Sequence, residues 1–447
     1  MNKVLEIFDT IRSYQQEGVK FLIDRDSALL ADEMGLGKTV QAAVASSSLV
    51  NANPRTKVLI VCPTSLCWNW EMEIKRWAPK MTVRRIRGDS DDRKAHLSLP
   101  FKAWIASYDQ IRNDIDFLRK ECKFDLVILD EAQIIKNPAS SIALACRQLR
   151  REKAWVLTGT PIENKLDDLL SIFAFLKPGL LHAALNIDQI HDRMAPYFLR
   201  RNKKEVLSEV PEIISQDLYL SLESKQQEAY EDELLDTRNS IHDMQGKIST
   251  VGLLAQITKL KQLCNFDVIS GESCKFKALE TILDGVEEKK EKILVFSQYV
   301  NSIMKIKTRL NNVPVDCLHG DMSSEERQKS IDLFEKSSGP RVFLISLKAG
   351  GVGINLVSAS RVILFDRWWN PAVEDQAINR AHRYGRKEPL HVIKFLVMNT
   401  IEERIEQILS EKRYLFEGYV NNADTAEIGP FTQEDLIRIV GIDALRN

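Results

Sequence analysis

Short apolar runs alternate with longer stretches of helical periodicity along most of the chain. Seven of these runs are apolar on both faces: residues 58–63, 103–108, 125–130, 154–159, 293–297, 342–346 and 361–366. A strand that is covered by helices on both sides has this character, and its alternation with helices is typical of a parallel sheet. Four runs precede residue 160 and three follow residue 290, so the pattern predicts two α/β lobes.

The segment between the two groups of runs, residues 180–290, has mostly helical periodicity, with charged residues among its leucines. We expect a hinge into the second lobe at about residues 200–212, RRNKKEVLSEVPE. Near the end of the chain, Thr432 and Asp435 form a capping-box pattern before an apolar run, which predicts a short final helix.

Composition narrows the class of protein only slightly. Hydrophobic residues make up 44% of the chain and charged residues 28%, the balance of a globular protein, and no apolar run reaches the roughly 20 residues of a membrane span. The N-terminus lacks the apolar core of a signal peptide, so we expect an intracellular protein, cytoplasmic in a bacterium, phage or virus and nuclear in a eukaryote. A net charge of −1 does not decide for or against nucleic acid, because phosphate affinity depends on local basic surface.

The seven cysteines are scattered along the chain. Cys62 and Cys67 are close in sequence, but no second pair or nearby histidine completes a zinc ligand set. We therefore expect reduced, mostly buried thiols and no zinc.

A glycine-rich turn, DEMGLGKT, begins at Asp32 between an apolar stretch and a helical one. Asp32 stands where the full G-x-x-x-x-G-K-[ST] pattern has its first glycine, but Gly35, Gly37, Lys38 and Thr39 are present. Backbone N–H groups of such a turn surround phosphates, the lysine neutralises them, and the threonine hydroxyl can ligate Mg²⁺. ATP and Mg²⁺ are therefore the expected cofactors; a glycine turn that merely ends in Lys-Thr is the alternative.

Two adjacent carboxylates, Asp130 and Glu131, stand at the end of a buried apolar run. Carboxylates are unfavourable in such a place unless they act on something. Asp130 is placed to hold Mg²⁺, directly or through water, and Glu131 to orient and deprotonate an attacking water, the division of labour that phosphoryl transfer needs. A capping pair at the end of a strand is the alternative.

The motifs DEMGLGKT, DEAQIIKN and LTGTPIEN, in this order, resemble helicase superfamily two. The later segments SLKAGGVGINL and FDRWWNPAVEDQAINRAHRYGR are similar to the Swi/Snf family of DNA-dependent ATPases. This resemblance covers nearly the whole chain and implies two recA-like parallel-sheet lobes in tandem, an α/β fold. The first lobe is expected over residues 1–202 and the second over 203–447, with a helical insertion at about 221–263.

The resemblance implies roles for residues outside the phosphate-binding turn. Gln15 matches the glutamine that reads adenine, and Gly351 and Gly353 match a glycine turn of the second lobe that faces the cleft. Arg380 and Arg383 match two arginine fingers that reach the γ-phosphate, for which a guanidinium fork is suited. Taken alone, these two arginines, three residues apart on an expected helix, would indicate surface ion pairs.

Three residues match positions that couple hydrolysis to lobe movement in the family. Thr158 and Thr160 belong to the LTGTPIEN motif, and Gln133 stands where many relatives have histidine. The exchange at Gln133 is expected to affect coupling more than hydrolysis.

The resemblance places four more residues along a nucleic-acid track, Thr64 and Ser107 in the first lobe and Ser346 and Lys348 in the second. Their hydroxyl and ammonium groups can contact phosphate oxygens, so we expect binding that is non-specific in sequence and strongly salt-dependent. Basic clusters at 84–87 and 200–204 either contact the nucleic-acid backbone or form a solvated face. Four tryptophans are expected to pack rather than to stack on bases: Trp68, Trp70, Trp368 and Trp369.

The chain departs from the family by lacking a helical insertion after LKPG, since only a short segment separates Gly179 from Met194. Nothing like a chromodomain, bromodomain or zinc finger is visible, so nucleosome remodelling is unsupported and a bare motor is expected. Such a minimal core often takes its specificity from a recruiting protein partner.

The leading hypothesis is an ATP-dependent translocase that moves along double-stranded DNA and remodels protein–DNA or DNA structures. A strand-separating helicase acting on DNA or RNA is the second hypothesis. A catalytically silent nucleic-acid clamp is the third, and it is disfavoured because Lys38, Asp130, Glu131, Arg380 and Arg383 are all present.

Overall fold

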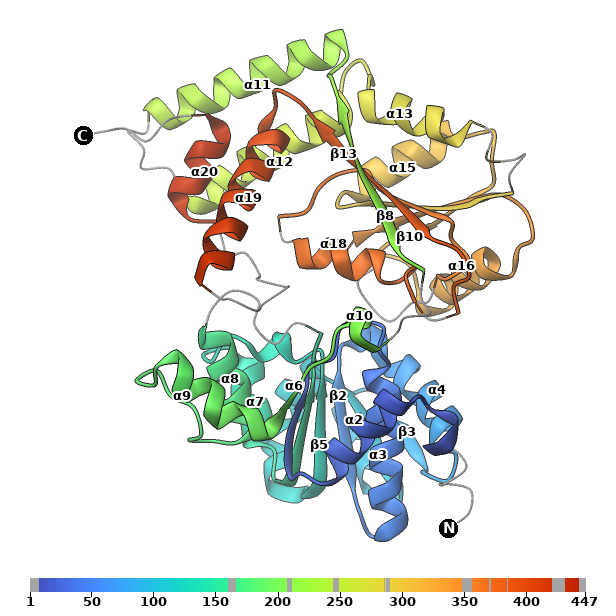
Figure 1. Ribbon diagram of the computed structural model, residues 1–447, viewed down its shortest axis with the longest axis vertical. Coiled ribbons are helices and arrows are strands. Elements are labelled where there is room, and N and C mark those ends of the chain that lie inside the picture. The colour runs from blue at the N-terminus through green and yellow to red at the C-terminus, as the bar shows by residue number, and fades with distance from the viewer. Residues whose placement is uncertain are drawn as a thin grey trace. The chain divides into compact units, whose positions relative to one another are not determined.

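Two parallel β-sheets, one in each half of the chain, organise the protein in the computed structural model (Figure 1). The structure describes residues 8–159, 166–206, 211–243, 249–284, 286, 290–347, 356–369, 371–383, 385–419 and 431–441. The chain divides into two compact units, Met1–Glu209 and Val210–Asn447. The prediction of an α/β fold with two parallel-sheet lobes is confirmed.

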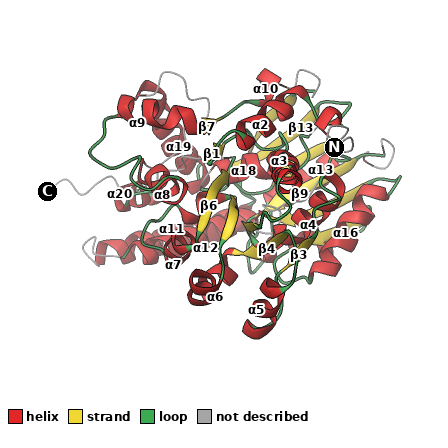
Figure 2. Ribbon diagram, turned by 90° about the horizontal axis from the view of Figure 1, so that it is seen from below, coloured by secondary structure: helices red, strands yellow, loops and turns green. Residues whose placement is uncertain are grey.

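The first unit contains a seven-stranded sheet with the order β3-β4-β2-β5-β6-β1-β7. Its strands are β1 (Ser27–Leu30), β2 (Val58–Cys62), β3 (Val83–Arg85), β4 (Ala103–Ser107), β5 (Phe124–Asp130), β6 (Arg151–Leu157) and β7 (Phe198–Leu199). Its helices are α2 (Ser13–Ile23), α3 (Lys38–Ala52), α4 (Cys67–Trp77), α5 (Ser90–Ser98), α6 (Tyr108–Glu121), α7 (Ser141–Gln148), α8 (Leu166–Leu176), α9 (Ile187–Met194) and α10 (Lys203–Val206). Figure 2 shows helices in red around strands in yellow.

The central strands of this sheet are the apolar runs of the sequence. Every residue of β2 and β4 is buried, and in β5 all but one are. A strand buried on both faces needs apolar side chains at consecutive positions, which explains why these runs do not alternate. Further core side chains come from the inner faces of helices such as α6, whose first turn is capped by Ser107.

The second unit contains a six-stranded sheet with the order β10-β11-β9-β12-β13-β8. Its strands are β8 (Ile213–Leu220), β9 (Lys292–Ser297), β10 (Val315–Leu318), β11 (Arg341–Ser346), β12 (Arg361–Leu364) and β13 (Leu390–Val397). Its helices are α11 (Ser224–Asp243), α12 (Thr250–Asn265), α13 (Cys274–Leu283), α15 (Val300–Arg309), α16 (Ser324–Lys336), α18 (Pro371–Ile378), α19 (Ile401–Tyr419) and α20 (Gln433–Val440). Within the described ranges, no helix has both the length and the apolar character that crossing a membrane requires.

The prediction of mostly helical structure over residues 180–290 is wrong at β8. This strand lies at the edge of the second sheet and pairs in parallel with β13 along its whole length. Its first five residues are exposed, so its sequence IISQDLYL lacks the continuous apolar run of a covered strand. The helices α11 and α12 occupy the region in which the helical insertion was expected.

The predicted final helix is α20, and its capping box is confirmed. The Asp435 backbone N–H donates to the Thr432 hydroxyl at 3.1 Å, and the Thr432 N–H donates to the Asp435 carboxylate at 2.7 Å. Leu436, Ile439 and Val440 on its inner face join a core shared with α11, α12 and α19.

A buried polar network joins helices and strand ends in the second unit. The Lys275 ammonium donates to the Glu402 carboxylate at 2.6 Å and to the Asn265 side-chain oxygen at 2.9 Å. The Asn265 amide donates at 3.0 Å to Asp366, which lies two residues after the end of β12. The side chains of Lys275 and Glu402 are both 0% exposed. Each charge therefore depends on the other for the solvation that water no longer supplies.

Lys275→Met should destabilise the second unit by roughly 3–5 kcal/mol, because it leaves the Glu402 carboxylate buried without its cation. Lys277→Met is the matched control on the same helix, since Lys277 is 63% exposed and solvent screens its pair with Glu223, so its loss should change stability little. Urea unfolding of both variants measures the difference. Equal midpoints for the two variants would contradict the importance of the buried pair.

Candidate active site

Three neighbouring strands of the first unit bring the predicted ATP-site segments to one edge of the sheet. In the parallel register, Leu157 of β6 lies opposite Leu30 of β1 and opposite Asp130 of β5. The glycine-rich turn after β1, the carboxylates at the end of β5 and Thr158 after β6 therefore start from the same level. This is the carboxyl edge, where parallel α/β sheets bind their ligands.

The glycine-rich turn leads directly into α3. Gly37 has φ +78° and occupies the cap position of that helix, which has no side-chain cap. A Cβ atom at Gly37 would lie 2.5 Å from the Gln15 amide nitrogen, so a side chain there would be both strained and obstructed. Gln15 itself donates to the Leu36 carbonyl at 3.2 Å. The backbone N–H groups at the start of α3 thus remain available for phosphate.

Lys38 lies close to the carboxylates of the site. Its ammonium donates to the Asp32 carbonyl at 2.6 Å. Burial lowers the pKa of Lys38, and the charges of Glu131, Asp32 and Asp130 act in the opposite direction. Thr39 follows in the first turn of α3 and is half-buried. Lys38 and Thr39 therefore lie at the carboxyl edge of the sheet, and their contacts with phosphate and Mg²⁺ stay predictions.

Three groups hold Asp130, whose carboxylate is buried. The Trp70 indole N–H donates to one carboxylate oxygen at 2.7 Å, and the Glu131 backbone N–H donates to the other at 3.0 Å. The Tyr108 hydroxyl donates to the Asp130 carbonyl at 2.8 Å. Burial, with the charge of Glu131, raises the pKa of Asp130 to about 7. A divalent cation would reverse that shift, so Asp130 with the Thr39 hydroxyl fits the oxygen donors that Mg²⁺ prefers.

Glu131 begins a hydrogen-bonded relay between two strand ends. The Gln133 amide donates to the Glu131 carboxylate at 2.8 Å, and the Thr158 hydroxyl donates to the Gln133 side-chain oxygen at 2.9 Å. Glu131 has φ +52°, a left-handed conformation that costs a residue with a side chain of order 1 kcal/mol or more. Backbone strain of this kind is concentrated at functional sites. The relay brings together the predicted catalytic Glu131 and two of the predicted coupling residues.

A buried ion pair between Arg201 and Asp32 anchors the start of the glycine-rich turn. The Arg201 guanidinium contacts both carboxylate oxygens of Asp32, at 2.6 and 3.0 Å. The Gln41 amide donates to Asp32 at 3.1 Å, and Arg201 donates back to the Gln41 oxygen at 2.9 Å. Asp32 and Gln41 are fully buried and Arg201 is 8% exposed. The aspartate that interrupts the glycine pattern is therefore an anchor for the turn.

The segment that carries Arg201 is bound along β1 rather than free. The Ala31 N–H donates to the Leu199 carbonyl at 2.7 Å, and the Glu33 N–H donates to the Arg201 carbonyl at 3.0 Å. The Lys203 N–H donates to the Glu33 carboxylate at 2.7 Å. Neither of the alternatives expected for the 200–204 cluster, a solvated face or a nucleic-acid contact, holds for Arg201. The expected hinge does not begin at residue 200, because the chain is attached to the first unit through Lys203.

In the second unit, Arg380 and Arg383 lie in the turn after α18, not on the expected helix, since α18 ends at Ile378. Arg380 is 6% exposed, and the Arg383 guanidinium donates to the Asn379 carbonyl at 3.1 Å. Ser346 ends β11 and is 3% exposed. Four of the predicted residues lie outside the described residues: Thr160, Lys348, Gly351 and Gly353.

Two predicted nucleic-acid contacts lie at the same carboxyl edge of the first sheet. Thr64 is exposed in a 3-10 turn just after β2. Ser107 ends β4, and its buried hydroxyl accepts the Gln110 N–H at 3.3 Å as the cap of α6. Ser107 therefore has a structural task beside the predicted one. In the basic cluster at 84–87, Arg85 forms an ion pair with Glu71.

The tryptophans mostly pack, as predicted. Trp70 is fully buried, and Trp369 meets Phe431 edge to face with ring centroids 5.3 Å apart. Trp368 packs against the core of the second sheet, whereas Trp68 is 44% exposed. The bond from Trp70 to Asp130 had no signal in the sequence, because the two residues are 60 positions apart.

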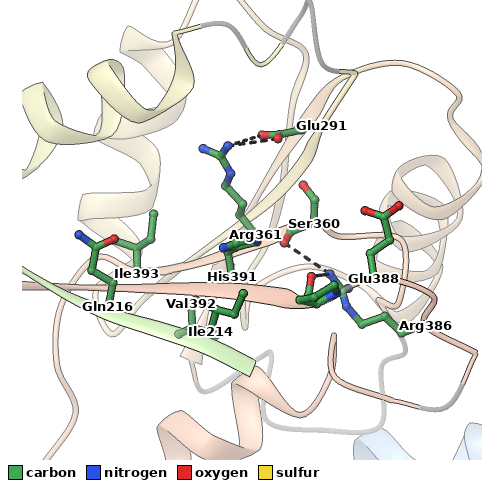
Figure 3. A pocket seen from close by; sticks show the side chains of 11 residues that line it. Ile214, Gln216, Glu291, Ser360, Arg361, Arg386, Glu388, His391, Val392 and Ile393 are labelled. Carbon is green, nitrogen blue, oxygen red and sulfur yellow. Dashed lines mark hydrogen bonds and ion pairs between the residues drawn. The ribbon is translucent and has the colours of Figure 1, made fainter. Parts of the chain in front are cut away.

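A cavity of about 340 Å³ lies elsewhere in the second unit (Figure 3). Residues from the amino-terminal ends of β8, β12 and β13 line it, including Ile214, Arg361 and His391. Arg361 forms an ion pair with Glu291 at 3.1 Å, and Arg386 donates to the Ser360 carbonyl at 3.4 Å. The cavity is at the strand edge opposite to the one where ligands bind in parallel sheets, and no predicted site residue lines it.

Comparison with known families agrees with this arrangement. Residues 14–269, more than half of the chain, match the SNF2-related domain. This chain belongs to the SNF2-related family. Residues 274–385 match the helicase conserved C-terminal domain. The prediction of a Swi/Snf-type member of helicase superfamily two is confirmed. The prediction of an ATP-dependent enzyme is confirmed at the level of the family.

Relatives of this SNF2-related chain occur in bacteria and eukaryotes. A Mycoplasma pneumoniae protein called an uncharacterized ATP-dependent helicase is 36% identical over 96% of this chain and 44% of its own length. A Mus musculus SWI/SNF-related regulator of chromatin, subfamily A member 1, is 32% identical over 88% of this chain and 42% of its own length. This chain thus spans less than half the length of these relatives. A solved Sulfolobus solfataricus SWI2/SNF2 ATPase core in complex with dsDNA is 32% identical over 93% of this chain and 94% of that one, with a TM-score of 0.45.

The raised pKa of Asp130 predicts an acidic limb in the pH profile of Mg²⁺-dependent ATP hydrolysis. Only the ionised carboxylate binds the cation, so activity should fall as the pH drops through the pKa, and more Mg²⁺ should move this limb to lower pH. Trp70→Phe removes a hydrogen bond to the ionised form, which raises the pKa and should move the limb upward by about one pH unit.

Trp77→Phe is the control for Trp70→Phe, since both residues lie on α4 and the Trp77 indole N–H has no hydrogen-bond partner in the structure. ATPase rates between pH 5.5 and 9 at limiting Mg²⁺ make the comparison. A limb that stays in place in Trp70→Phe would argue against Asp130 as the titrating group.

Arg201→Gln should destabilise the first unit by roughly 3–5 kcal/mol, because Asp32 would be left as an uncompensated buried charge. The double variant Asp32→Asn/Arg201→Gln should recover part of this loss, since two amides can still pair. Arg150→Gln, at an exposed position of the same unit, should change stability by no more than about 0.5 kcal/mol. Denaturant unfolding of the unaltered chain, the single variants Asp32→Asn and Arg201→Gln, the double variant and the control tests the pair. Additive effects of the two single changes would contradict the coupling.

Proposed function

We propose that this chain hydrolyses ATP with Mg²⁺ to move along double-stranded DNA, displacing bound proteins or remodelling DNA structure. The observation that carries the proposal is the relay from Glu131 through Gln133 to Thr158, beside Lys38 and Asp130. An ATPase must transmit the state of its nucleotide to the rest of the protein. A hydrogen-bonded connection from the hydrolytic carboxylate to a neighbouring strand end provides a route for this.

The residues of the first unit divide the chemistry between them. The Asp130 carboxylate and the Thr39 hydroxyl would hold Mg²⁺, which would neutralise charge on the phosphates. Lys38 contributes its ammonium to the same phosphates, with its position set by the carbonyl of Asp32. Glu131 orients the attacking water and accepts its proton, and the bond from Gln133 fixes one of its oxygens. Gln15, bonded to the turn, contacts the adenine.

We assign roles to the remaining predicted residues as well. Arg380 and Arg383 act as arginine fingers on the γ-phosphate, and Gly351 and Gly353 are proposed to bind the nucleotide. Thr160, two positions after Thr158 in the same LTGTPIEN motif, is proposed to share its coupling role. The observed bonds of Gln133 support its coupling role, since an amide can donate to Glu131 and accept from Thr158 at once, as a histidine of suitable tautomer also can.

Double-stranded DNA is proposed as the track because the motifs of the second unit resemble the Swi/Snf pattern and because a Mus musculus relative is named a regulator of chromatin. Thr64, Ser107, Ser346 and Lys348 would contact phosphates, so binding should be non-specific in sequence and weaken steeply with salt. A recruiting protein partner is proposed to supply specificity.

A strand-separating helicase is the second candidate, favoured by the name ATP-dependent helicase of the Mycoplasma pneumoniae relative. Both functions use the same ATP chemistry and differ in whether the strands part. The nucleic acid that stimulates hydrolysis and the fate of a labelled duplex therefore distinguish them.

Phosphate release should rise strongly with double-stranded DNA and much less with single-stranded DNA or RNA. Glu131→Gln should retain ATP binding and lose at least about 100-fold in turnover, because the group that accepts the proton is gone. Glu121→Gln, at the exposed end of α6, is the matched control and should keep full turnover.

Three results would change the assignment. Full turnover in Glu131→Gln would remove that residue from its role. Separation of labelled strands during hydrolysis would favour the helicase. A rate that no nucleic acid stimulates would leave the silent clamp.

A further inference from the structure

Two thiols of the first unit lie in contact next to the candidate active site. Cys62 is the last residue of β2 and Cys67 the first of α4. Their sulfur atoms are 3.6 Å apart, with the Cys62 thiol donating to the Cys67 sulfur. The Cys67 sulfur also lies 3.7 Å from the Pro63 carbonyl oxygen. The five-residue separation in sequence is therefore closed by the turn between strand and helix.

We propose that Cys62 and Cys67 form a reversible oxidation site, at which an intramolecular disulfide switches the candidate active site off. The disulfide itself follows from the sulfur geometry alone. Its effect on ATP hydrolysis rests on the function proposed above.

The two thiols differ in exposure and in pKa, as a pair made of a reactive and a resolving cysteine should. Cys62 is fully buried, whereas Cys67 is half-buried and is the more accessible of the two residues. The hydrogen bond from Cys62 lowers the pKa of Cys67, and the Arg85 guanidinium acts in the same direction. Burial raises the pKa of Cys62. Cys67 is thus the thiolate that reacts first and Cys62 the thiol that resolves it.

With hydrogen peroxide as the oxidant, the reaction balances in two steps. The Cys67 thiolate attacks one peroxide oxygen, the O–O bond breaks, hydroxide leaves and a sulfenic acid forms. The Cys62 sulfur then attacks the Cys67 sulfur, the S–O bond breaks, and the departing hydroxide takes the Cys62 proton as water. The two thiols lose two electrons and two protons in total, and peroxide becomes two waters. A dithiol reductant reverses the disulfide by exchange.

The bond would move α4 rather than β2. A disulfide is about 2.05 Å long, so the sulfurs must approach each other by about 1.5 Å. β2 is held between β4 and β5 by parallel pairing along its length, whereas α4 is joined to it by a short turn. The start of the helix is therefore the part that yields.

Trp70 connects this movement to the candidate active site. It lies three positions after Cys67, within the first turn of α4, and its indole N–H donates to Asp130 at 2.7 Å. Displacing the start of the helix weakens this bond to the predicted Mg²⁺ ligand. The turn inside the disulfide loop also carries Thr64, a predicted phosphate contact. Oxidation would act on both through one covalent bond.

Treatment of the whole chain with hydrogen peroxide, followed by peptide mass spectrometry, tests the site. We expect a Cys62–Cys67 cross-link with the loss of two hydrogens, which dithiothreitol reverses and which is absent in Cys67→Ser and Cys62→Ala. Cys122→Ser is the matched control, because Cys122 is also half-buried but has no such partner, and it should leave the cross-link intact. Oxidation of Cys122 without a Cys62–Cys67 cross-link would overturn the proposal.

The consequence is measured on the same samples by tryptophan fluorescence and by ATP turnover. Oxidation should change the emission and lower turnover at least about 5-fold in the unaltered chain and in Cys122→Ser, and do neither in Cys67→Ser. A cross-linked chain with unchanged emission and turnover would overturn the switch. A chain that hydrolyses no ATP even when reduced would count against the proposed function alone, since cross-link and emission still report on the thiols.

Discussion

The parallel register of β1, β6 and β5 is the constraint on which the candidate active site depends. It places the glycine-rich turn, Thr158 and the Asp130–Glu131 pair at one level of one sheet edge, although they are far apart in sequence. Side chains of ordinary length can then reach one another, as the bonds of Gln133 to Glu131 and Thr158 illustrate. A shift of one residue in this register would turn each side chain to the opposite face.

Burial of charge is the means by which this edge is organised. Asp32 is fully buried and stays paired with Arg201, which ties the end of the first unit to the turn. Asp130 is also buried, but its neighbours include a second carboxylate, so its pKa rises to about 7. The first is a satisfied structural ion pair, and the second is a carboxylate prepared to meet a cation. The contrast separates an anchoring carboxylate from a catalytic one at the same edge of the sheet.

Whether a strand could be predicted from the sequence depended on how far it is covered by other elements. β2 and β5 are covered on both sides, and their continuous apolar runs are visible in the sequence. β8 is an exposed edge strand, so nothing demanded an apolar run, and its sequence was grouped with helices. Arg380 and Arg383 were placed on a helix for a different reason. Their spacing of three is compatible with a helix, but it does not reveal that α18 has already ended at Ile378.

The sequence by itself determined the fold class, the family and the candidate site residues, because glycines, lysines and paired carboxylates in a fixed order are local signals. It contained no sign that Arg201 lies under Asp32, 169 positions away, or that Trp70 bonds Asp130. Nor could spacing alone show that the Cys62 and Cys67 sulfurs are in contact. Only the tertiary structure decided these pairs, since partners distant in sequence are selected by how strands and helices pack, and a residue's type does not encode who its neighbour will be.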